Sequence, residues 1–325
     1  MTIRSARTVP NATAAAAAPA LSSAEARQSS WRSRVRNTLG SNMFLLPILL
    51  TFVVLYVIPM VQSIYYSFTN YTGYSTNVQF VGLKNYLSVF QDSDMFAALS
   101  FTVEFAIGTT VVVTVLAIPL ALVLNTKFPG RNLVRSVFFF PAIPSAAILG
   151  LVWGFILNPL GSGVINTVLH SALGAGPVPW LSNAHLAQLS TILVMVWAQT
   201  GWHVILYLAY LQSIPGEYKE SAVIDGASPF QRFRCITLPL LTPALTVSTL
   251  LLMTNGLKVY DLPFTLTRGG PGFATRTITQ AIIEDGIANA QIGPASALSV
   301  LFLIVVAAVI LVQLTASRAV ERKYS

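Results

Sequence analysis

Residues 220–239 read ESAVIDGASPFQRFRCITLP, and this stretch determines how the rest of the chain is interpreted. It lies between two apolar runs, each long enough to cross a bilayer as a helix. Local signals predict two short helices, because Pro215 suits the first position of one helix and Gly226 suits the left-handed residue after its end. Ser228 and Gln231 have the spacing of a capping box, which predicts the start of the second helix. We therefore expect a helical elbow between the two apolar runs.

Large apolar side chains accompany the polar residues of this elbow: Val223, Ile224, Phe230 and Phe233. A segment that faces water has little reason to carry such side chains unless another surface covers them. The elbow is therefore predicted to be a docking site for a partner.

Composition places the chain among membrane proteins. Apolar residues make up 54 % of the sequence and charged residues 9 %, whereas soluble domains contain about 25 % charged residues. The net charge of +8 does not indicate a nucleic-acid binder, because the basic residues are spread between apolar runs rather than gathered in one patch. The one cysteine, Cys235, cannot form a disulfide within the chain.

Several stretches have the roughly 20 apolar residues that a helix needs to cross a hydrocarbon core. There are six of them: 43–63, 98–124, 137–157, 186–211, 238–257 and 295–314. Residues 1–40 are polar and Ala-rich, so we expect a disordered cytoplasmic tail before a membrane domain at 41–318. A second cytoplasmic tail is expected at 319–325. Prolines inside the runs, such as Pro141 and Pro144, are expected to be tolerated in membrane helices.

Basic residues indicate the orientation, since Lys and Arg are enriched in cytoplasmic loops. With the N-terminus inside, 15 of the 19 basic residues lie in cytoplasmic segments. The four on the outer side are Lys84, Lys258, Arg268 and Arg276. The reversed orientation would place most basic residues outside. With six spans, both termini and the elbow are therefore predicted to be cytoplasmic.

No catalytic or metal-binding pattern is present in the sequence. His170, His185 and His203 have no metal-ligand spacing with cysteine or carboxylates, so we expect no metal site. The sequence has no Gly-Lys dipeptide and therefore no Walker A loop. If ATP drives the function, ATP and Mg²⁺ must bind another chain. We expect neither enzyme activity nor a cofactor in this one.

The stretch 220–239 resembles the EAA loop of ABC-importer permeases. That pattern is Glu-Ala-Ala, three residues, Gly, nine residues, Ile, any residue, Leu, Pro, and Ser221 is the one departure from it. In the family, the loop (here 215–239) forms coupling helices that seat in a cleft of a cytoplasmic ATPase. The resemblance implies this role for Glu220, Ser221, Ala222, Asp225, Gly226, Ile236, Leu238 and Pro239.

Other segments resemble carbohydrate-uptake permeases, in particular the first of the two paired permeases of the maltose and glycerol-phosphate type. They are 80–86 (FVGLKNY), 212–215 (QSIP), 257–261 (LKVYD) and 267–271 (TRGGP). The resemblance implies an all-α protein of the cell membrane with the six-helix, MetI-like fold of type I importer permeases. It also implies the partners, which are a second permease, two ATP-binding subunits and an extracellular or lipoprotein solute-binding protein that delivers a sugar.

Sugar sites combine aromatic faces with side-chain amides, and polar groups within membranes face the interior of the helix bundle. The candidates for sugar contact in the fourth and fifth spans are Gln199, Trp202, Tyr207, Asn255, Tyr260 and Asp261. These residues could instead pack helices together, and Lys258 could pair with Asp261 three residues later.

The alternative function is a secondary transporter or channel for a small polar solute. Secondary transporters couple ions through carboxylates or histidines within the membrane. Glu104 and Asp261 are the carboxylates near the predicted spans, and both are expected close to a span end. This alternative also leaves the apolar elbow unexplained, so we prefer the ATP-driven importer.

Overall fold

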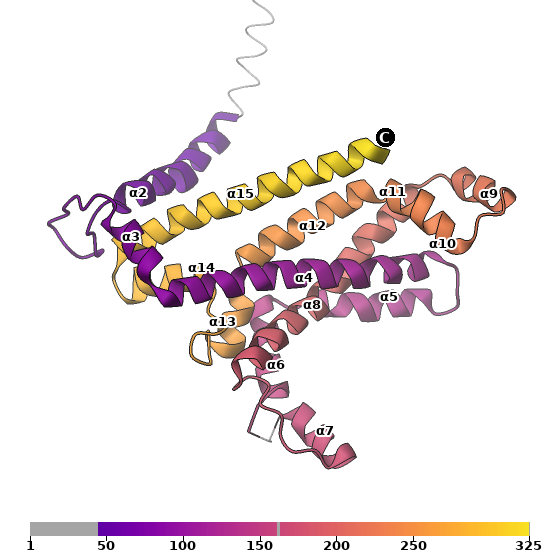
Figure 1. Cartoon of the computed structure of the whole chain (residues 1–325), viewed down its shortest axis with the longest axis horizontal. Coiled ribbons are helices and arrows are strands. Elements are labelled where there is room, and N and C mark those ends of the chain that lie inside the picture. Colours follow the sequence, from indigo (N-terminus) through magenta and orange to yellow (C-terminus); the bar gives the residue numbers. More distant parts are fainter. Residues whose placement is uncertain (1–44, 161–162, 325) are drawn as a thin grey trace, which may run out of the picture. The chain divides into compact units, whose positions relative to one another are not determined.

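The computed structural model describes residues 45–160 and 163–324, which form helices joined by loops (Figure 1). No strand occurs in this part of the chain, where Thr69 and Phe80 form an isolated antiparallel bridge. The chain divides into two units, Met1–Val61 and Gln62–Ser325. The predicted N-terminal tail lies outside the described residues.

The first apolar helix is Leu45–Tyr66, and the division between the two units falls within it. A π-helical turn, η1 (Val53–Val57), precedes α2 (Ile58–Tyr66). Pro59 follows this turn, and a proline removes one hydrogen bond from the helical ladder. The irregular turn therefore lies where the sequence already interrupts the helix.

Long helices form the centre of the second unit. α4 (Ser93–Asn125) packs against α8 (Ala184–Ser213) and α12 (Thr242–Leu257). α12 in turn packs against α15 (Ile292–Tyr324) and therefore lies between α4 and α15 (Figure 1). The main cluster of buried apolar side chains lies among α4, α8 and α12 and includes Phe101, Phe105, Val113, Val204, Tyr207, Leu211 and Leu252.

Small residues allow these helices to approach closely, as is common in membrane bundles. A Cβ added at Gly256 in α12 would lie 2.8 Å from the Cα of Ala106 in α4. A Cβ added at Gly201 in α8 would overlap the backbone carbonyl of Phe138 in α5 (Arg131–Phe139). A larger side chain at either glycine therefore has to push a neighbouring backbone away.

The third predicted span, 137–157, is a bent pair of helices rather than one helix. Arg131–Ala142 and α6 (Ala146–Ile156) meet at an angle of 94°. Prolines 141 and 144 lie at the break and lack the amide that continues a helix. The hydroxyl of Ser145 then accepts a hydrogen bond from the amide of the third residue of α6 and caps the new helix. The expectation of a continuous helix here is therefore wrong.

The fifth predicted span, 238–257, is also bent. Pro229–Leu240 and α12 meet at an angle of 66°, with Pro239 and Pro243 on either side of the break. The first member of this pair joins α10 (Pro229–Arg232), the π-helical turn η3 (Phe233–Thr237) and α11 (Leu238–Leu240).

The described residues hold four helices that are long and apolar enough to cross a membrane, or up to six if each bent pair forms one span. The four are Leu45–Tyr66, Ser93–Asn125, Ala184–Ser213 and Ile292–Ala319. The predicted all-helical membrane class is confirmed. The number of spans and the side of both termini stay predictions. α15 stays helical to Tyr324, so most residues of the predicted C-terminal tail continue this helix.

The segment after α2, the start of α3 and the start of α15 meet at one end of the second unit. The amide of Gly293 donates to the carbonyl of Tyr71 at 2.8 Å. The side-chain amide of Asn85 donates to the carbonyls of Ser67 and Thr69. These bonds tie the segment after α2 to α3 and to the start of α15. The remaining short elements of the second unit are α3 (Lys84–Gln91), η2 (Phe140–Ala142), α7 (Val164–Leu173), α13 (Asp261–Thr267), α14 (Ile278–Ile283) and η4 (Glu284–Ala288).

A buried arginine stabilises this end of the second unit. Arg276 is 6 % exposed, and its Nε and Nη2 atoms donate to Glu284 and Asp285, each at 3.0 Å. The ring of Phe273 lies 5.3 Å from the guanidinium carbon. Removing one member of such a buried cluster leaves an uncompensated charge. Arg276 therefore holds the loop between α13 and α14 against η4.

Candidate functional site

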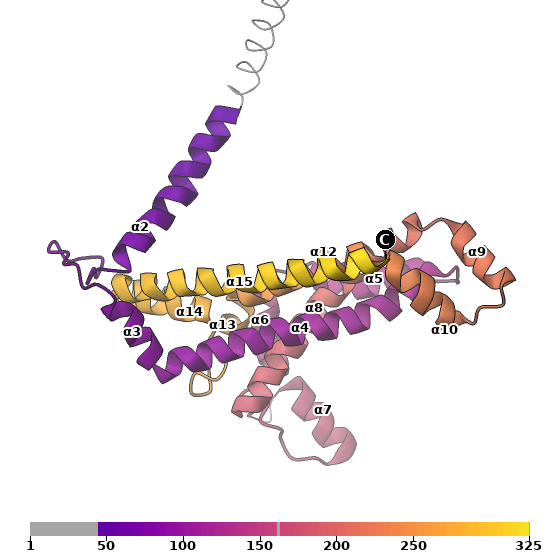
Figure 2. The same cartoon turned by 45° about the horizontal axis from the view of Figure 1, so that its top comes forward.

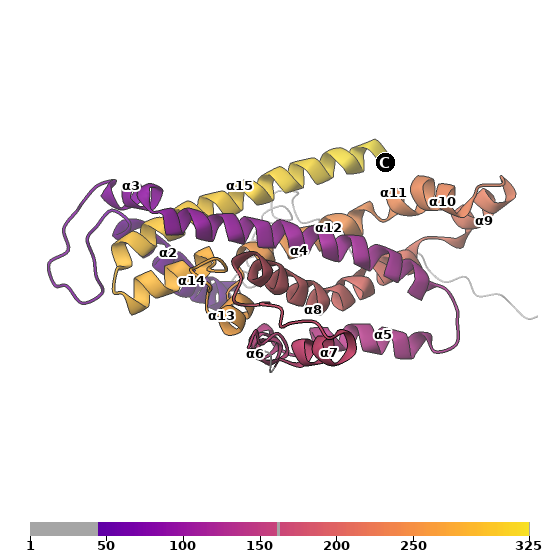
Figure 3. The same cartoon turned by 60° about the horizontal axis from the view of Figure 1, so that its bottom comes forward.

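The predicted elbow is present and consists of α9 (Gly216–Ile224) and α10. It lies at one end of the second unit, whereas α3 and α14 lie at the other end (Figures 1, 2 and 3). Pro215 occupies the capping position before α9 rather than its first helical position. The predicted start of this helix is therefore wrong by one residue.

The turn between the two elbow helices is a Schellman motif. The amide of Gly226 donates to the carbonyl of Val223 at 3.1 Å, and the amide of Ala227 donates to that of Ala222 at 2.9 Å. Asp225 is the capping residue, and Gly226 has a φ of +74°. A residue with a Cβ would lose roughly 1–2 kcal/mol in this left-handed conformation. The predicted role of Gly226 in the turn is confirmed.

A capping box starts the second elbow helix. The Ser228 hydroxyl accepts from the amide of Gln231 at 3.3 Å, and the Gln231 side chain accepts from the amide of Ser228 at 2.8 Å. Pro229 occupies the first helical position, where its missing amide removes no bond. Both halves of the predicted box are therefore confirmed, and the backbone of the elbow is held by bonds within itself.

The elbow presents apolar side chains to its surroundings. The exposed fractions are 55 % for Val223, 85 % for Ile224 and 68 % for Phe230, whereas Phe233 is half-buried. Capped ends hold the backbone while Val223, Ile224 and Phe230 remain more than half exposed. The geometry is that of a preformed projection whose tip can enter an apolar cleft.

The signature residues of the elbow divide into exposed and buried positions. Glu220 and Ser221 are exposed, whereas Ala222 is 8 % exposed. Because position 221 faces outward, the hydroxyl that replaces the family alanine stays accessible to solvent. The departure from the family pattern therefore disturbs no packing within this chain.

The end of the signature connects the elbow to two long helices. Ile236 is half-buried in η3. Leu238 and Pro239 line a cavity of about 340 Å³ with Thr242 at the start of α12 and with residues near the end of α15, Ala316 and Ser317. The end of the signature therefore lies beside both the start of α12 and the C-terminal part of α15.

Two candidates for sugar contact, Gln199 and Trp202, lie together at the bend between η2 and α6. Both line a cavity of about 110 Å³, and Leu262 at the start of α13 completes the wall. The side of the cavity formed by the bent pair consists of Pro141, Ala142, Pro144, Ala146 and Leu149. Sequence reasoning identified the polar and aromatic members, but it missed the proline break that shapes the cavity.

The candidates around the end of α12 do not line this cavity. Asn255 is exposed on α12, and Asp261 is exposed at the start of α13. The Tyr260 ring stacks on that of Phe264, with 5.0 Å between the centroids. Lys258 and Asp261 form no ion pair within the described residues. The salt bridges in this part of the chain join Arg276 to Glu284 and to Asp285. The predicted pairing of Lys258 with Asp261 is therefore wrong.

Tyr207 lies in the helix core rather than in a cavity. Its side chain is fully buried among α4, α8 and α12. Four residues earlier on α8, His203 is also buried, and its Nδ1 lies 2.7 Å from the hydroxyl of Ser248 on α12. This bond joins α8 to α12 within the core. Ser248 was not identifiable from the sequence, because nothing local marks it as the partner of a residue 45 positions away.

Comparison with known proteins identifies relatives that cover most of the chain. Residues 113–325 match the family described as "Binding-protein-dependent transport system inner membrane component". The chain is 34 % identical over 281 residues to the probable starch degradation products transport system permease protein AmyD of Thermoanaerobacterium thermosulfurigenes, which covers 86 % of this chain and 94 % of that protein. It is also 34 % identical over 277 residues to the trehalose/maltose transport system permease protein MalF of Thermococcus litoralis, covering 85 % and 92 %.

A solved structure has the same fold. It is the crystal structure of a bacterial ABC transporter involved in the import of the acidic polysaccharide alginate. One of its chains superposes with a TM-score of 0.77 at 24 % identity, covering 90 % of this chain and 99 % of that chain. The helical architecture described above is therefore that of a known importer chain.

Proposed function

Because the chain belongs to the binding-protein-dependent transport system inner membrane component family, we propose that it is the permease subunit of an ATP-driven sugar importer. The family accounts for the membrane-spanning helices and for the location in the cell membrane. Two relatives with 34 % identity are named for starch degradation products and for trehalose and maltose. These names support a mono- or oligosaccharide as the substrate.

The exposed, internally capped elbow is the observation that carries this proposal. A permease without a nucleotide site needs a rigid surface through which a separate ATPase can act. The elbow is rigid, because a Schellman motif and a capping box hold its backbone. It also has an apolar tip, formed by Ile224 and Phe230. We place the ATPase contact at this tip.

The helices leaving the elbow connect it to the cavity at the bend. α8 runs without interruption from Gln199 and Trp202 to Ser213, directly before the elbow, and η3 leads from the elbow into α12. ATP-driven closure of the partner ATPases would move the elbow and thereby shift α8 against the bent pair. Such a shift would change the access of a sugar to the cavity that Gln199 and Trp202 line.

The assembly that we propose contains a second permease, two ATP-binding subunits and an extracellular or lipoprotein solute-binding protein. We retain Gln199 and Trp202 as the first candidates for sugar contact, because they share one cavity. Asn255, Tyr260 and Asp261 remain candidates on a separate surface. Tyr207 would support α8 from within the core rather than touch the substrate.

The alternative of an ion-driven transporter has little support among the described residues. Glu104 is exposed on α4 and lies well inside this helix, which begins at Ser93. The position of Glu104 near the outer end of its span stays a prediction. Asp261 lies on α13 and is also exposed. Neither carboxylate is buried beside a polar partner, as an ion-coupling group within the membrane would be.

The ATPase contact is tested with two matched substitutions. Ile224 on the elbow and Ile287 at the opposite end are 85 % and 76 % exposed, so an aspartate fits at either position. We expect Ile224→Asp to abolish co-purification of the ATPase and sugar uptake, and Ile287→Asp to retain ATPase association. Normal ATPase recovery with Ile224→Asp would contradict docking at the elbow.

The substrate class is tested separately. Affinity of the associated binding protein, measured over a panel of saccharides, should identify the sugar. Uptake of that sugar by cells expressing Gln199→Ala should fall relative to wild type. Uptake by cells expressing Asn255→Ala tests the second candidate surface, and a fall with this variant alone would favour that surface. If all saccharides fail to bind and uptake follows an unrelated solute, the sugar assignment is wrong although the elbow assignment stands.

A further inference from the structure

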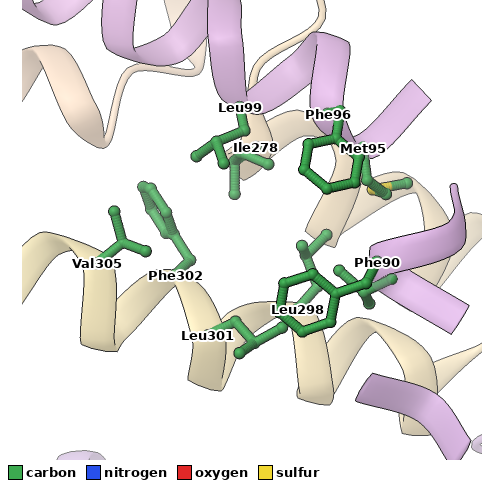
Figure 4. A pocket seen from close by; sticks show the side chains of 10 residues that line it. Phe90, Met95, Phe96, Leu99, Ile278, Leu298, Leu301, Phe302 and Val305 are labelled. Atoms are coloured by element: carbon green, nitrogen blue, oxygen red, sulfur yellow. The ribbon is translucent and has the colours of Figure 1, made fainter. Parts of the chain in front are cut away.

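An apolar groove opens between α3, α4, α14 and α15 (Figure 4). α3 and α14 lie at the opposite end of the second unit from the elbow (Figure 1). Its volume is about 110 Å³. Figure 4 shows side chains of α4 on one side and of α15 on the other, with Phe90 of α3 at one end. The residues that shape it include Phe90, Phe96, Leu99, Leu301, Phe302 and Val305. All the lining side chains are apolar.

A polar pocket adjoins this groove. Val89, Met95 and Leu298 line both cavities, so the two lie side by side. The polar pocket has a volume of about 180 Å³, and its polar lining consists of Ser88, Asp92, Asp285 and Gln291. Asp92 precedes α4 and Asp285 lies in η4, so two segments far apart in the sequence contribute carboxylates to one pocket.

The order of the two cavities matches the layers of a bilayer. On the orientation indicated by the basic residues, the starts of α4 and α15 lie on the outer side. The groove residues of α15, from Leu298 to Val305, extend about 10 Å along the helix toward the membrane centre. Gln291 and Asp285 precede α15 and therefore lie farther outward. The polar pocket is thus at the level of lipid headgroups, and the groove is at the level of acyl chains.

The charge at the pocket is negative. Arg276 neutralises part of it, because it pairs with both Glu284 and Asp285. The side chain of Asp92 accepts from the amide of Asp94 and, within the described residues, forms no ion pair. Lys84, the basic residue of α3, lies at the opposite end of that helix from Phe90. Asp285 is therefore already paired with Arg276, and Asp92 is the carboxylate lining the pocket that a further cation could neutralise.

We propose that the groove and the polar pocket together bind an outer-leaflet phospholipid with a primary-amine headgroup. One acyl chain would fill the apolar groove and make van der Waals contacts with the side chains of α4 and α15. An empty groove would leave these side chains without those contacts. The ammonium group would lie beside Asp92, in the pocket that Asp285 also lines, and donate up to three hydrogen bonds. A choline headgroup has no N–H donor and cannot replace it. The bound lipid would join α3, α4, η4 and α15 at the outer end.

The test uses the full chain, purified and placed in nanodiscs made of equal parts phosphatidylethanolamine and phosphatidylcholine. Tightly retained lipid is then measured by native mass spectrometry after detergent release. Leu301→Trp fills the groove, whereas Leu303→Trp places the same side chain on the exposed face of the same helix as a control. Asp92→Asn removes one charge and keeps a good capping residue for α4.

The wild type and Leu303→Trp should retain phosphatidylethanolamine in preference to phosphatidylcholine. Leu301→Trp should lose most of the retained lipid. Asp92→Asn should still retain lipid but should lower the preference by up to about fivefold, the scale of one exposed ion pair. Unchanged lipid retention with Leu301→Trp, or equal retention of both lipids by the wild type, would overturn the proposal. Loss of a co-purifying second permease from Leu301→Trp without loss of lipid would show that a protein occupies the groove.

Discussion

The elbow and the helix core use glycine for opposite reasons. In the elbow, a Cβ added at Gly226 would meet nothing within 4 Å, and glycine is needed for its φ of +74°. In the core, Gly201 and Gly256 lie in regular helices, and glycine is needed because neighbouring backbone leaves no space. The elbow is shaped by bonds within itself and the core by contacts between distant helices. Substitutions in the elbow should therefore alter coupling, and substitutions in the core should alter folding.

The largest effect is expected from Gly201→Ala in the core. Its Cβ would overlap the carbonyl of Phe138, so α8 and α5 must separate. Overpacking of this kind destabilises by about 1–3 kcal/mol, which exceeds the gain in helix propensity. We expect a lower melting temperature in detergent and less folded protein in the membrane. Gly108→Ala is the control, because its Cβ would make ordinary contact with Ile192 at 3.5 Å. Equal stability of the two variants would show that the core glycines do not set the helix spacing.

A smaller loss of stability, but a large loss of transport, is expected from Gly226→Val. The β-branched residue resists the left-handed backbone and costs roughly 1–2 kcal/mol locally. Because the turn then reorients α9 against α10, sugar uptake should fall while the amount of inserted protein stays close to wild type. Gly174→Val is a matched control, since Gly174 also ends a helix with φ +62° and also meets nothing. Equal uptake by the two variants would argue against a coupling role for the elbow turn.

This contrast also explains which parts were predictable from the sequence. The elbow follows from signals within a few residues, such as the pair Ser228 and Gln231, and its caps were predicted correctly apart from the shift at Pro215. The bends at Pro141 and Pro239 also had a local signal. A proline in a membrane helix is compatible with a straight helix or a break, and the outcome depends on neighbours that the local sequence does not specify.

The contacts that assemble the second unit could not be predicted. The hydroxyl of Thr102 on α4 accepts from the amide of Ile278, 176 residues away. The side chain of Gln188 on α8 donates to the carbonyl of Ala274, 86 residues away. Hydropathy indicates that these helices are buried in a membrane, but it does not indicate which helices are neighbours. For the same reason Tyr207 was expected to face the substrate and instead lies in the core.

The next smaller effect tests whether the elbow is held by its own bonds. Ser228→Ala removes the cap of α10 and should cost about 1 kcal/mol. Gln231→Ala removes the reciprocal bond. Because the two bonds form one box, the double variant should lose less stability than the sum of the single variants. Thermal unfolding and uptake of all three variants measure this coupling. Strictly additive losses would indicate that the box does not act as a unit.

The smallest effect is expected from Ser221→Ala, which restores the family residue. Position 221 is exposed, and no hydrogen bond from its hydroxyl appears among the described residues, so the change in stability should stay within about 0.5 kcal/mol. Ala222, the next residue, is buried, and Ala222→Ser should be less well tolerated because it buries a hydroxyl. Uptake should be unchanged for Ser221→Ala and reduced for Ala222→Ser. If Ser221→Ala alters uptake at unchanged stability, its hydroxyl contacts the ATPase, and the elbow surface that docks extends from its apolar tip to this face of α9.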